Sequence, residues 1–220
     1  MRARAAARAL AAEDAAGAAE LLEAAARIAV RGEAALAVAL GQALLEPGDD
    51  LAYDHVGAIY AAAVERGLDA ARDLLVAPAP RRAYAPPRGR ADPGLGEMTL
   101  GHKKALARGR RDPDLLARLA AEGDPRVLRE LLDNPRLTEA LAVRVAAQRP
   151  CRPEALRVVA QHRRWRTRPA VLRAVALNPY AEPEVVLKVL PALGRTDLDA
   201  IARDGALHAL VRAAARRLAL

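Results

Sequence analysis

Polar and apolar positions follow a twelve-residue pattern that occurs five times between residues 112 and 193. Each copy begins with a charged residue and proline and continues with apolar residues about one helical turn apart. Each therefore predicts one short helix whose apolar side must be covered by a neighbour. The copies are DPDLLARLAAEG (112–123), DPRVLRELLDNP (124–135), RPEALRVVAQHR (152–163), RPAVLRAVALNP (168–179) and EPEVVLKVLPAL (182–193).

Proline marks where these predicted helices begin. At the first position of a helix it costs no hydrogen bond and presets φ. Segment 138–149 fits between the second and third copies, with Thr138 in place of proline as the predicted N-cap. Asn-Pro at 134–135 and 178–179 predicts a helix end, because proline excludes the α conformation from the residue before it. The pattern thus predicts a helix every twelve to sixteen residues.

Outside the repeats, the sequence predicts an N-terminal helical region, a linker, and one helix on each side of the repeats. Residues 77–98 contain five prolines and three glycines, which indicates a linker or an extended strap. We therefore predict a helical region at 1–76, the linker at 77–98 and a repeat domain at 99–220, in which a helix follows Thr99 to residue 108 and a polar-faced cap helix covers 206–220. In the first region, apolar periodicity predicts helices near 3–12, 14–30, 33–45, 52–66 and 68–76.

Consecutive helices pair into units of 28 to 30 residues, measured from Pro125 to Pro153 and from Pro153 to Pro183. Over about 112–205 this pattern resembles the bacterial HEAT-like and leucine-rich-repeat-variant proteins. The resemblance implies an all-α fold: an α-solenoid of short helices preceded by an N-terminal helical bundle or array. Some leucine-rich-repeat-variant proteins hold an iron–sulfur cluster through N-terminal cysteines. This chain has no cysteine there, so we expect no cofactor.

Composition argues against most catalytic chemistry. The chain has no serine, which excludes a serine nucleophile, and its histidines lack the spacing of a zinc site. Neighbouring arginines would lower the pKa of the single cysteine, Cys151, but no base is visibly paired with it. We expect no enzyme, no metal and no small-molecule substrate. The four threonines are predicted helix caps: Thr99, Thr138, Thr167 and Thr196.

Cellular location follows from the same residues. A single cysteine cannot form an internal disulfide, which favours a cytoplasmic protein. Charges interrupt the N-terminal apolar stretch, so we expect no signal peptide. No uncharged stretch reaches the roughly 18 residues that span a bilayer, so we expect no membrane partner. Hydrophobic residues make up 53% of the chain but aromatic residues only 2%, which favours closely packed helices over sheets.

Positive charge is concentrated in the second part of the chain. Residues 1–98 carry a net charge of −3 and the remainder +11, and 144–173 hold nine arginines against one glutamate. Such a region attracts nucleic acid or an acidic protein. The alternative is that these arginines only form the solvated face of short helices. The candidate binding residues, from a stripe on alternate helices and from HRRWRTR at 162–168, are Arg126, Arg129, Arg157, Arg163, Arg164, Trp165, Arg166, Arg168, Lys188 and Arg212.

Trp165 has two interpretations: a side chain packed between helices, or a platform that stacks on bases or on a partner's arginine. The leading functional hypothesis is a non-catalytic adaptor whose solenoid binds another protein. The alternative is a nucleic-acid-binding protein that uses 144–173. A resemblance to HEAT-like DNA glycosylases extends only to being a small basic helical-repeat protein, and no motif locates a catalytic acid.

Overall fold

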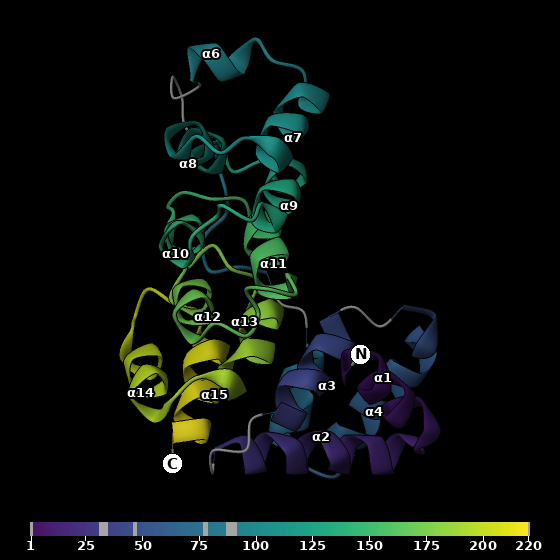
Figure 1. Ribbon diagram of the computed structural model, residues 1–220. Helices are drawn as coiled ribbons and strands as arrows, with labels where there is room; N and C mark the ends of the chain where they lie inside the picture. Colours follow the sequence, from purple (N-terminus) through teal and green to yellow (C-terminus); the bar gives the residue numbers. More distant parts are fainter. Residues whose placement is uncertain (1, 31–34, 46–47, 77–78, 87–91, 220) are drawn as a thin grey trace. The chain divides into compact units, whose positions relative to one another are not determined.

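The computed structural model describes residues 2–30, 35–45, 48–76, 79–86 and 92–219. In this part of the chain it contains fifteen α-helices, two short 3-10 helices and no strand (Figure 1). The predicted all-α fold is confirmed. The helices form two compact units, the terminal unit (Met1–Ala79 with Glu182–Leu220) and the central unit (Pro80–Ala181).

The terminal unit contains the five helices predicted near the N-terminus and the last three helices of the chain. The observed N-terminal bounds differ from the predicted ones by two residues at most, and residues 33 and 34 lie outside the described part. The helices are α1 (Arg2–Ala12), α2 (Ala15–Val30), α3 (Ala35–Leu45), α4 (Tyr53–Glu65), α5 (Asp69–Leu75), α13 (Pro183–Val189), α14 (Arg195–Arg203) and α15 (Ala209–Ala219), with 3-10 turns η1 (Gly48–Asp50) and η2 (Leu190–Ala192).

Alanine and leucine fill the core of this unit. Helix α2 packs against α4 and α5, α1 packs against α3, and Leu10, Leu22, Leu40 and Ile59 are fully buried. Helices α3 and α13 approach so closely that a Cβ added at Gly41 would lie 2.8 Å from the carbonyl oxygen of Lys188. Small side chains thus let short helices bury their apolar faces together.

The last three helices differ from the sequence-based expectation. We predicted that 99–220 forms one repeat domain, but α13 packs against α3 and α5, and α15 packs against α14, α13 and α2. The predicted cap helix at 206–220 begins at Ala209, and its apolar residues Val211, Ala214 and Ala215 are buried in the terminal unit. The twelve-residue pattern does not reveal this, because a buried apolar face looks the same whichever helix covers it.

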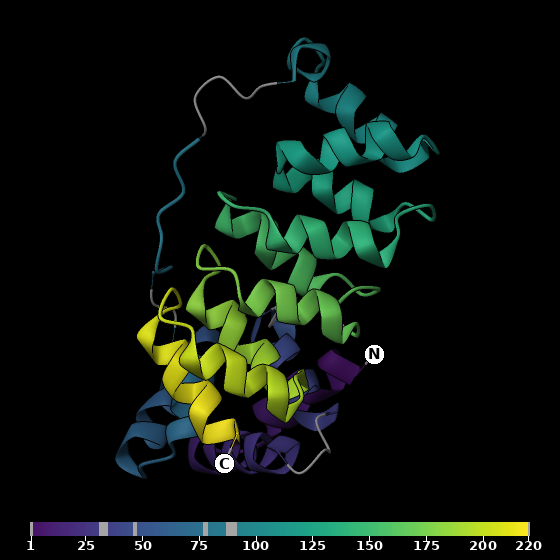
Figure 2. The same cartoon turned by 90° about the vertical axis from the view of Figure 1, so that its left-hand side faces the viewer.

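The central unit consists of the helices from α6 to α12, arranged in two layers after α6. Helix α9 contacts both α7 and α11 in one layer, and α10 contacts both α8 and α12 in the other (Figures 1 and 2). This array is compatible with a helical repeat. The helices are α6 (Pro93–Gly96), α7 (Leu100–Gly109), α8 (Pro113–Glu122), α9 (Pro125–Asp133), α10 (Glu139–Ala147), α11 (Pro153–Gln161) and α12 (Pro169–Ala176).

The predicted helix starts are largely confirmed. Proline is the first residue of α8, α9, α11, α12 and α13. Thr99 and Thr138 are N-caps, since their hydroxyls accept hydrogen bonds from the amides of His102 (3.2 Å) and Leu141 (3.3 Å). The other two predicted caps are wrong: Arg168 is the N-cap of α12, not Thr167, and Thr196 lies inside α14, whose N-cap is Gly194.

An asparagine that follows a helix joins it to the neighbouring helix of the same layer through hydrogen bonds from its side-chain amide. The Asn134 amide, after α9, donates to the carbonyls of Ala107 (2.7 Å) and Arg110 (2.9 Å) at the end of α7. The Asn178 amide, after α12, donates to the carbonyls of Ala146 (2.8 Å) and Gln148 (3.0 Å) at the end of α10. Both asparagines are buried, and each satisfies carbonyls that the helix end leaves without partners.

The predicted linker is not wholly irregular. Residues 79–86 contain no helix and run beside the stacked helices (Figure 2), where the Arg82 amide donates to the Pro179 carbonyl (3.1 Å). Residues 93–96, however, form helix α6, which we did not predict. The Asp92 side chain caps this single turn by accepting hydrogen bonds from the amides of Gly94 and Leu95. The rest of the predicted linker, at 77–78 and 87–91, lies outside the described residues.

Candidate functional site

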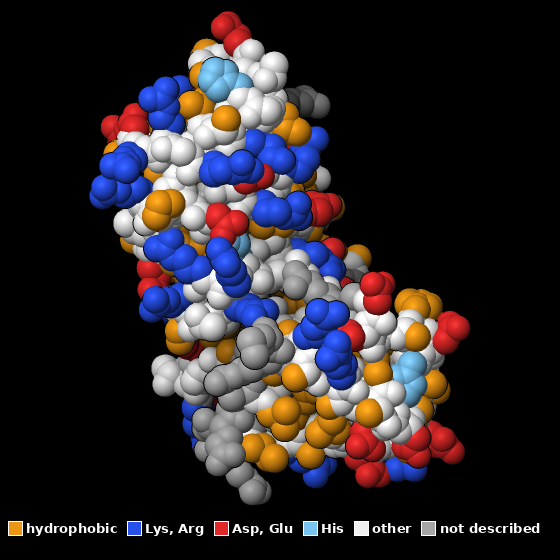
Figure 3. Space-filling model, turned by 45° about the vertical axis from the view of Figure 1, so that its right-hand side comes forward, with side chains coloured by type: hydrophobic (Ala, Val, Ile, Leu, Met, Phe, Trp, Pro, Cys, Tyr) orange, Lys and Arg blue, Asp and Glu red, His pale blue; other side chains and the backbone are white. Residues whose placement is uncertain are grey.

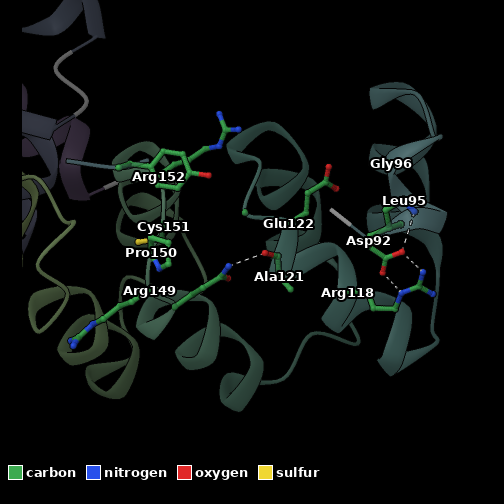
Figure 4. Close-up of a pocket in the computed structure, with 13 residues that line it drawn as sticks. Asp92, Leu95, Gly96, Arg118, Ala121, Glu122, Arg149, Pro150, Cys151 and Arg152 are labelled. Carbon is green, nitrogen blue, oxygen red and sulfur yellow. Dashed lines mark hydrogen bonds and ion pairs between the residues drawn. The ribbon is translucent and has the colours of Figure 1, made fainter. Parts of the chain in front are cut away.

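The central unit contains a hollow between Tyr84, the Asp92–Gly96 turn, the end of α8 and the loop from α10 to α11. Its volume is about 590 Å³, within the range of small-ligand pockets. Tyr84, Leu95, Arg118, Cys151 and Arg152 are among its lining residues (Figure 4). The hollow therefore joins three chain segments that are far apart in the sequence.

An ion pair closes one end of this hollow. Arg118 and Asp92 point toward one another (Figure 4), with Nε 2.6 Å from Oδ2 and the second guanidinium nitrogen 2.7 Å from Oδ1. The hydrogen bonds from Arg118 lower the pKa of Asp92 to about 2. Because the same carboxylate caps α6, the pair also holds this helix against α8.

The cysteine in this hollow is not set up as a nucleophile. Burial raises the pKa of the Cys151 thiol to about 11, although the amide of Asn178, 3.5 Å from Sγ, and the charge of Arg149 act in the opposite direction. The sequence suggested that neighbouring arginines lower this pKa, but the burial of Cys151 outweighs them. Arg149 donates to the Leu177 carbonyl, and Arg152 lies over the ring of Tyr84, 5.4 Å from its centroid.

A second, open groove of about 570 Å³ lies between α8 and α10. Its lining includes apolar residues such as Ala117, Leu141 and Val145 and the charged residues Arg118 and Arg144. Arg118, Ala121 and Gln148 line both the groove and the hollow, so the two are continuous. This combination of an apolar surface and exposed guanidinium groups is suited to a peptide segment that carries both apolar and acidic side chains.

The residues of the predicted arginine stripe are divided between the two units. Arg126 and Arg129 are exposed on α9 and Arg157 is half-buried on α11, all in the central unit, whereas Lys188 and Arg212 belong to the terminal unit. The prediction that Lys188 binds a partner is wrong. It is 3% exposed, and its ammonium group donates to Glu184 (2.8 Å) and to the Leu44 carbonyl (3.3 Å), because α3 covers this face of α13.

The HRRWRTR segment stabilises the end of α9. Trp165 is 2% exposed, and its indole N–H donates to the Leu132 carbonyl (3.0 Å), so it is a core residue and not a stacking platform. Arg164 donates to the carbonyls of Asn134 (3.1 Å) and Leu137 (3.0 Å) and lies over the Trp165 ring, 4.4 Å from its centroid. After α11, where no asparagine follows the helix, Trp165 and Arg164 thus donate to the carbonyls at the end of the neighbouring helix, as Asn134 does after α9 and Asn178 after α12.

The remaining candidates of this segment are at the surface. Arg163 lies 3.5 Å from the carboxylate of Asp133, and Arg168 lies 3.9 Å from that of Glu139. Both arginines are exposed, so these pairs contribute little to stability. Arg166 is half-buried, and its guanidinium group has no hydrogen-bond or ion-pair partner among the described residues.

The sequence-based reasoning missed the hollow, because it treated 77–98 as a linker. A signal was present: Asp92-Pro93 repeats the Asp-Pro that begins the helices at 112–113 and 124–125. The pattern therefore contained a start for α6, although only one helical turn follows it.

The described residues contain no group of three His, Cys, Asp or Glu side chains placed to hold a metal ion. Within the same residues, every helix is too short or too polar to cross a bilayer. Comparison of the sequence with protein-family models and with curated proteins, and of the structure with solved structures, found no match.

Proposed function

We propose that this chain is a non-catalytic adaptor that binds another protein through the hollow and groove of the central unit. The observation that carries the proposal is the continuous depression from Tyr84 to Arg144, which combines apolar residues with exposed arginines. The central unit holds 22 lysines and arginines against 10 aspartates and glutamates, so the partner segment is acidic. Cys151, which lines the hollow, is buried, and this burial raises the pKa of its thiol to about 11.

We propose further that the central unit is a HEAT-like helical repeat of the bacterial type and that the protein acts in the cytoplasm. Two layers of short helices, each begun by proline or a cap, support the first statement. The single buried cysteine supports the second. A stack of this kind presents equivalent positions along one face, where side chains can vary to suit a partner.

The alternative, nucleic-acid binding through 144–173, has less support than the sequence suggested. Arg149 and Arg164 donate to backbone carbonyls, Arg152 lies over Tyr84, and Arg163 and Arg168 face carboxylates. Fewer guanidinium groups in this region are therefore free to meet phosphates.

The experiment is affinity capture from native extract with an Ala121→Trp variant, which fills the depression where hollow and groove meet. Ala121 is exposed, so the larger side chain leaves the fold intact, as circular dichroism would verify. Ala105→Trp, at an exposed position of α7 outside the depression, is the matched control. The partner should be retained by wild type and control and lost with Ala121→Trp, and calorimetry on the purified pair should reproduce the difference. Equal retention by both variants would refute the proposal.

A further inference from the structure

Arginines are concentrated on three loops at one edge of the central unit, those that follow α7, α9 and α11. Residues 108–112, 133–139 and 162–168 hold eight arginines and three acidic residues. This edge is distinct from the hollow, because α10 begins here at Glu139 and ends at the hollow near Gln148.

The three loops stack directly on one another. The Asn134 amide donates to the carbonyls of Ala107 and Arg110, which joins the second loop to the first. Arg164 and Trp165 donate to the carbonyls of Asn134 and Leu132, which joins the third loop to the second. The backbones of the three loops are therefore held together by buried and partly buried hydrogen bonds.

The guanidinium groups of four arginines of this edge have no hydrogen-bond or ion-pair partner among the described residues. We call them the arginine edge: Arg110, Arg111, Arg136 and Arg166. Arg166 is half-buried and the other three are exposed.

The acidic residues of the same loops are already engaged. The Asp112 carboxylate caps α8, Asp133 faces Arg163 and Glu139 faces Arg168. With eight arginines against three acidic residues, these loops keep an excess of positive charge. Figure 3 shows one face of the central unit, on which Lys and Arg side chains are numerous and Asp and Glu side chains lie among them.

The spacing of these charges suits a regular polyanion. Packed helices lie about 8–10 Å apart, so three stacked loops place cations along a line of about 20 Å. Guanidinium groups bind phosphate oxygens through two parallel hydrogen bonds, which a lysine cannot do. A nucleic-acid backbone presents phosphates at regular intervals, whereas carboxylates on a folded protein do not follow a line.

The edge offers no stacking surface for unpaired bases. Trp165 is the single aromatic residue of the three loops, and it is buried. Recognition of single strands relies on aromatic side chains that stack on bases, while duplexes are held mainly through their phosphates. The edge is therefore suited to a duplex.

We propose that the arginine edge binds the phosphodiester backbone of a nucleic-acid duplex without reading its base sequence. The proposal is independent of the adaptor function, because the two surfaces lie at opposite ends of the same helices. A protein that binds a partner at the hollow can hold a duplex at the edge at the same time.

The test is fluorescence anisotropy with a labelled DNA duplex of about 20 base pairs, measured over a range of about 25 to 200 mM KCl. If all four arginines contact phosphates, the logarithm of the association constant falls with the logarithm of the salt concentration with a slope of about −3 to −4. The double variant Arg136→Gln/Arg166→Gln reduces the magnitude of this slope by about 1.8. The fold should be unaffected, because neither side chain has a partner to lose.

The matched control is Arg195→Gln/Arg203→Gln, which removes the same charge from exposed positions of the terminal unit. An unchanged slope in the control and a reduced slope in the edge variant support the proposal. An RNA duplex tested in parallel should bind with a similar slope, while a single strand of equal length should bind more weakly. Equal losses in both double variants, competition by polyglutamate at equal charge concentration, or no binding at the lowest salt would each overturn it.

Discussion

At the scale of single residues, two buried asparagines and one tryptophan connect the helices of the central unit. Asn134, Asn178 and Trp165 all follow a helix and donate to carbonyls at the end of its neighbour. Such carbonyls lack partners within their own helix, so the donors satisfy groups that would otherwise be buried without hydrogen bonds. The repeated polar residue is thus as much a part of the fold as the repeated leucine.

Replacing Asn178 by alanine should lower the free energy of unfolding by about 2–3 kcal/mol, because two carbonyls lose their buried donor. Urea unfolding followed by circular dichroism would measure the change. Thr167→Ala serves as the control: Thr167 is exposed and its hydroxyl makes a single long hydrogen bond (3.4 Å), so a change below about 0.5 kcal/mol is expected. Equal values for the two variants would contradict the role of Asn178.

His162 should make stability depend on pH. Burial lowers the pKa of its imidazole below 6.5, against the opposing effect of Asp133, which lies 3.3 Å away, and with smaller lowering effects from Arg163 and Arg164. The unfolded chain therefore binds the proton more tightly than the folded chain, and stability falls as the pH drops below about 6.5.

A series of urea unfolding curves between pH 7.5 and pH 5.5 would test this dependence, with His162→Gln as the comparison. The variant, which cannot take up a proton at this position, should lose less stability over the same interval. If wild type and variant decline in parallel, the pH dependence comes from other groups.

At the scale of elements, glycines in the interiors of α3 and α4 differ in what surrounds them. A Cβ at Gly41 would lie 2.8 Å from the Lys188 carbonyl oxygen, whereas a Cβ at Gly57 would have no heavy atom within 4 Å. The same substitution should therefore have opposite effects. In α3 glycine permits close packing against α13, while in α4 it makes the helix less stable than alanine would.

We predict that Gly41→Ala destabilises the terminal unit by about 1–3 kcal/mol, since neither backbone can yield easily. Gly57→Ala should stabilise it by about 0.5–1 kcal/mol. Midpoints of urea or thermal unfolding would give both signs in one experiment. Stabilisation by both substitutions would mean that α3 and α13 do not approach as described.

At the scale of the whole molecule, the terminal unit is built from both ends of the chain. Leu40, Leu44 and Leu74 belong to a buried core, and α13 packs against the helices that carry them. A fragment that ends before the central unit would expose part of this surface to water, at a cost of about 25 cal/mol for each Å² of apolar area.

Residues 1–79 alone should therefore fail to fold cooperatively, whereas residues 80–181 alone should keep their helices. Circular dichroism and the dispersion of amide signals in NMR spectra would distinguish the two outcomes. The control is 1–79 joined to 182–220 through a Gly/Ser linker, which should restore a cooperative transition. A folded 1–79 fragment would show that the last three helices are dispensable for this core.

The sequence alone determined the all-α fold, the starts of most helices and the irregular backbone of 79–86, because proline, threonine caps and apolar spacing act on a residue's immediate neighbours. It also indicated that Trp165 could be a core residue. Tertiary structure decided which helix covers which apolar face. The contacts that show this join segments distant in sequence: Lys188 with α3, Asp92 with Arg118, and the three arginine loops with one another. An apolar stripe specifies that a face must be buried, but the shape and charge of the available partners decide against which helix.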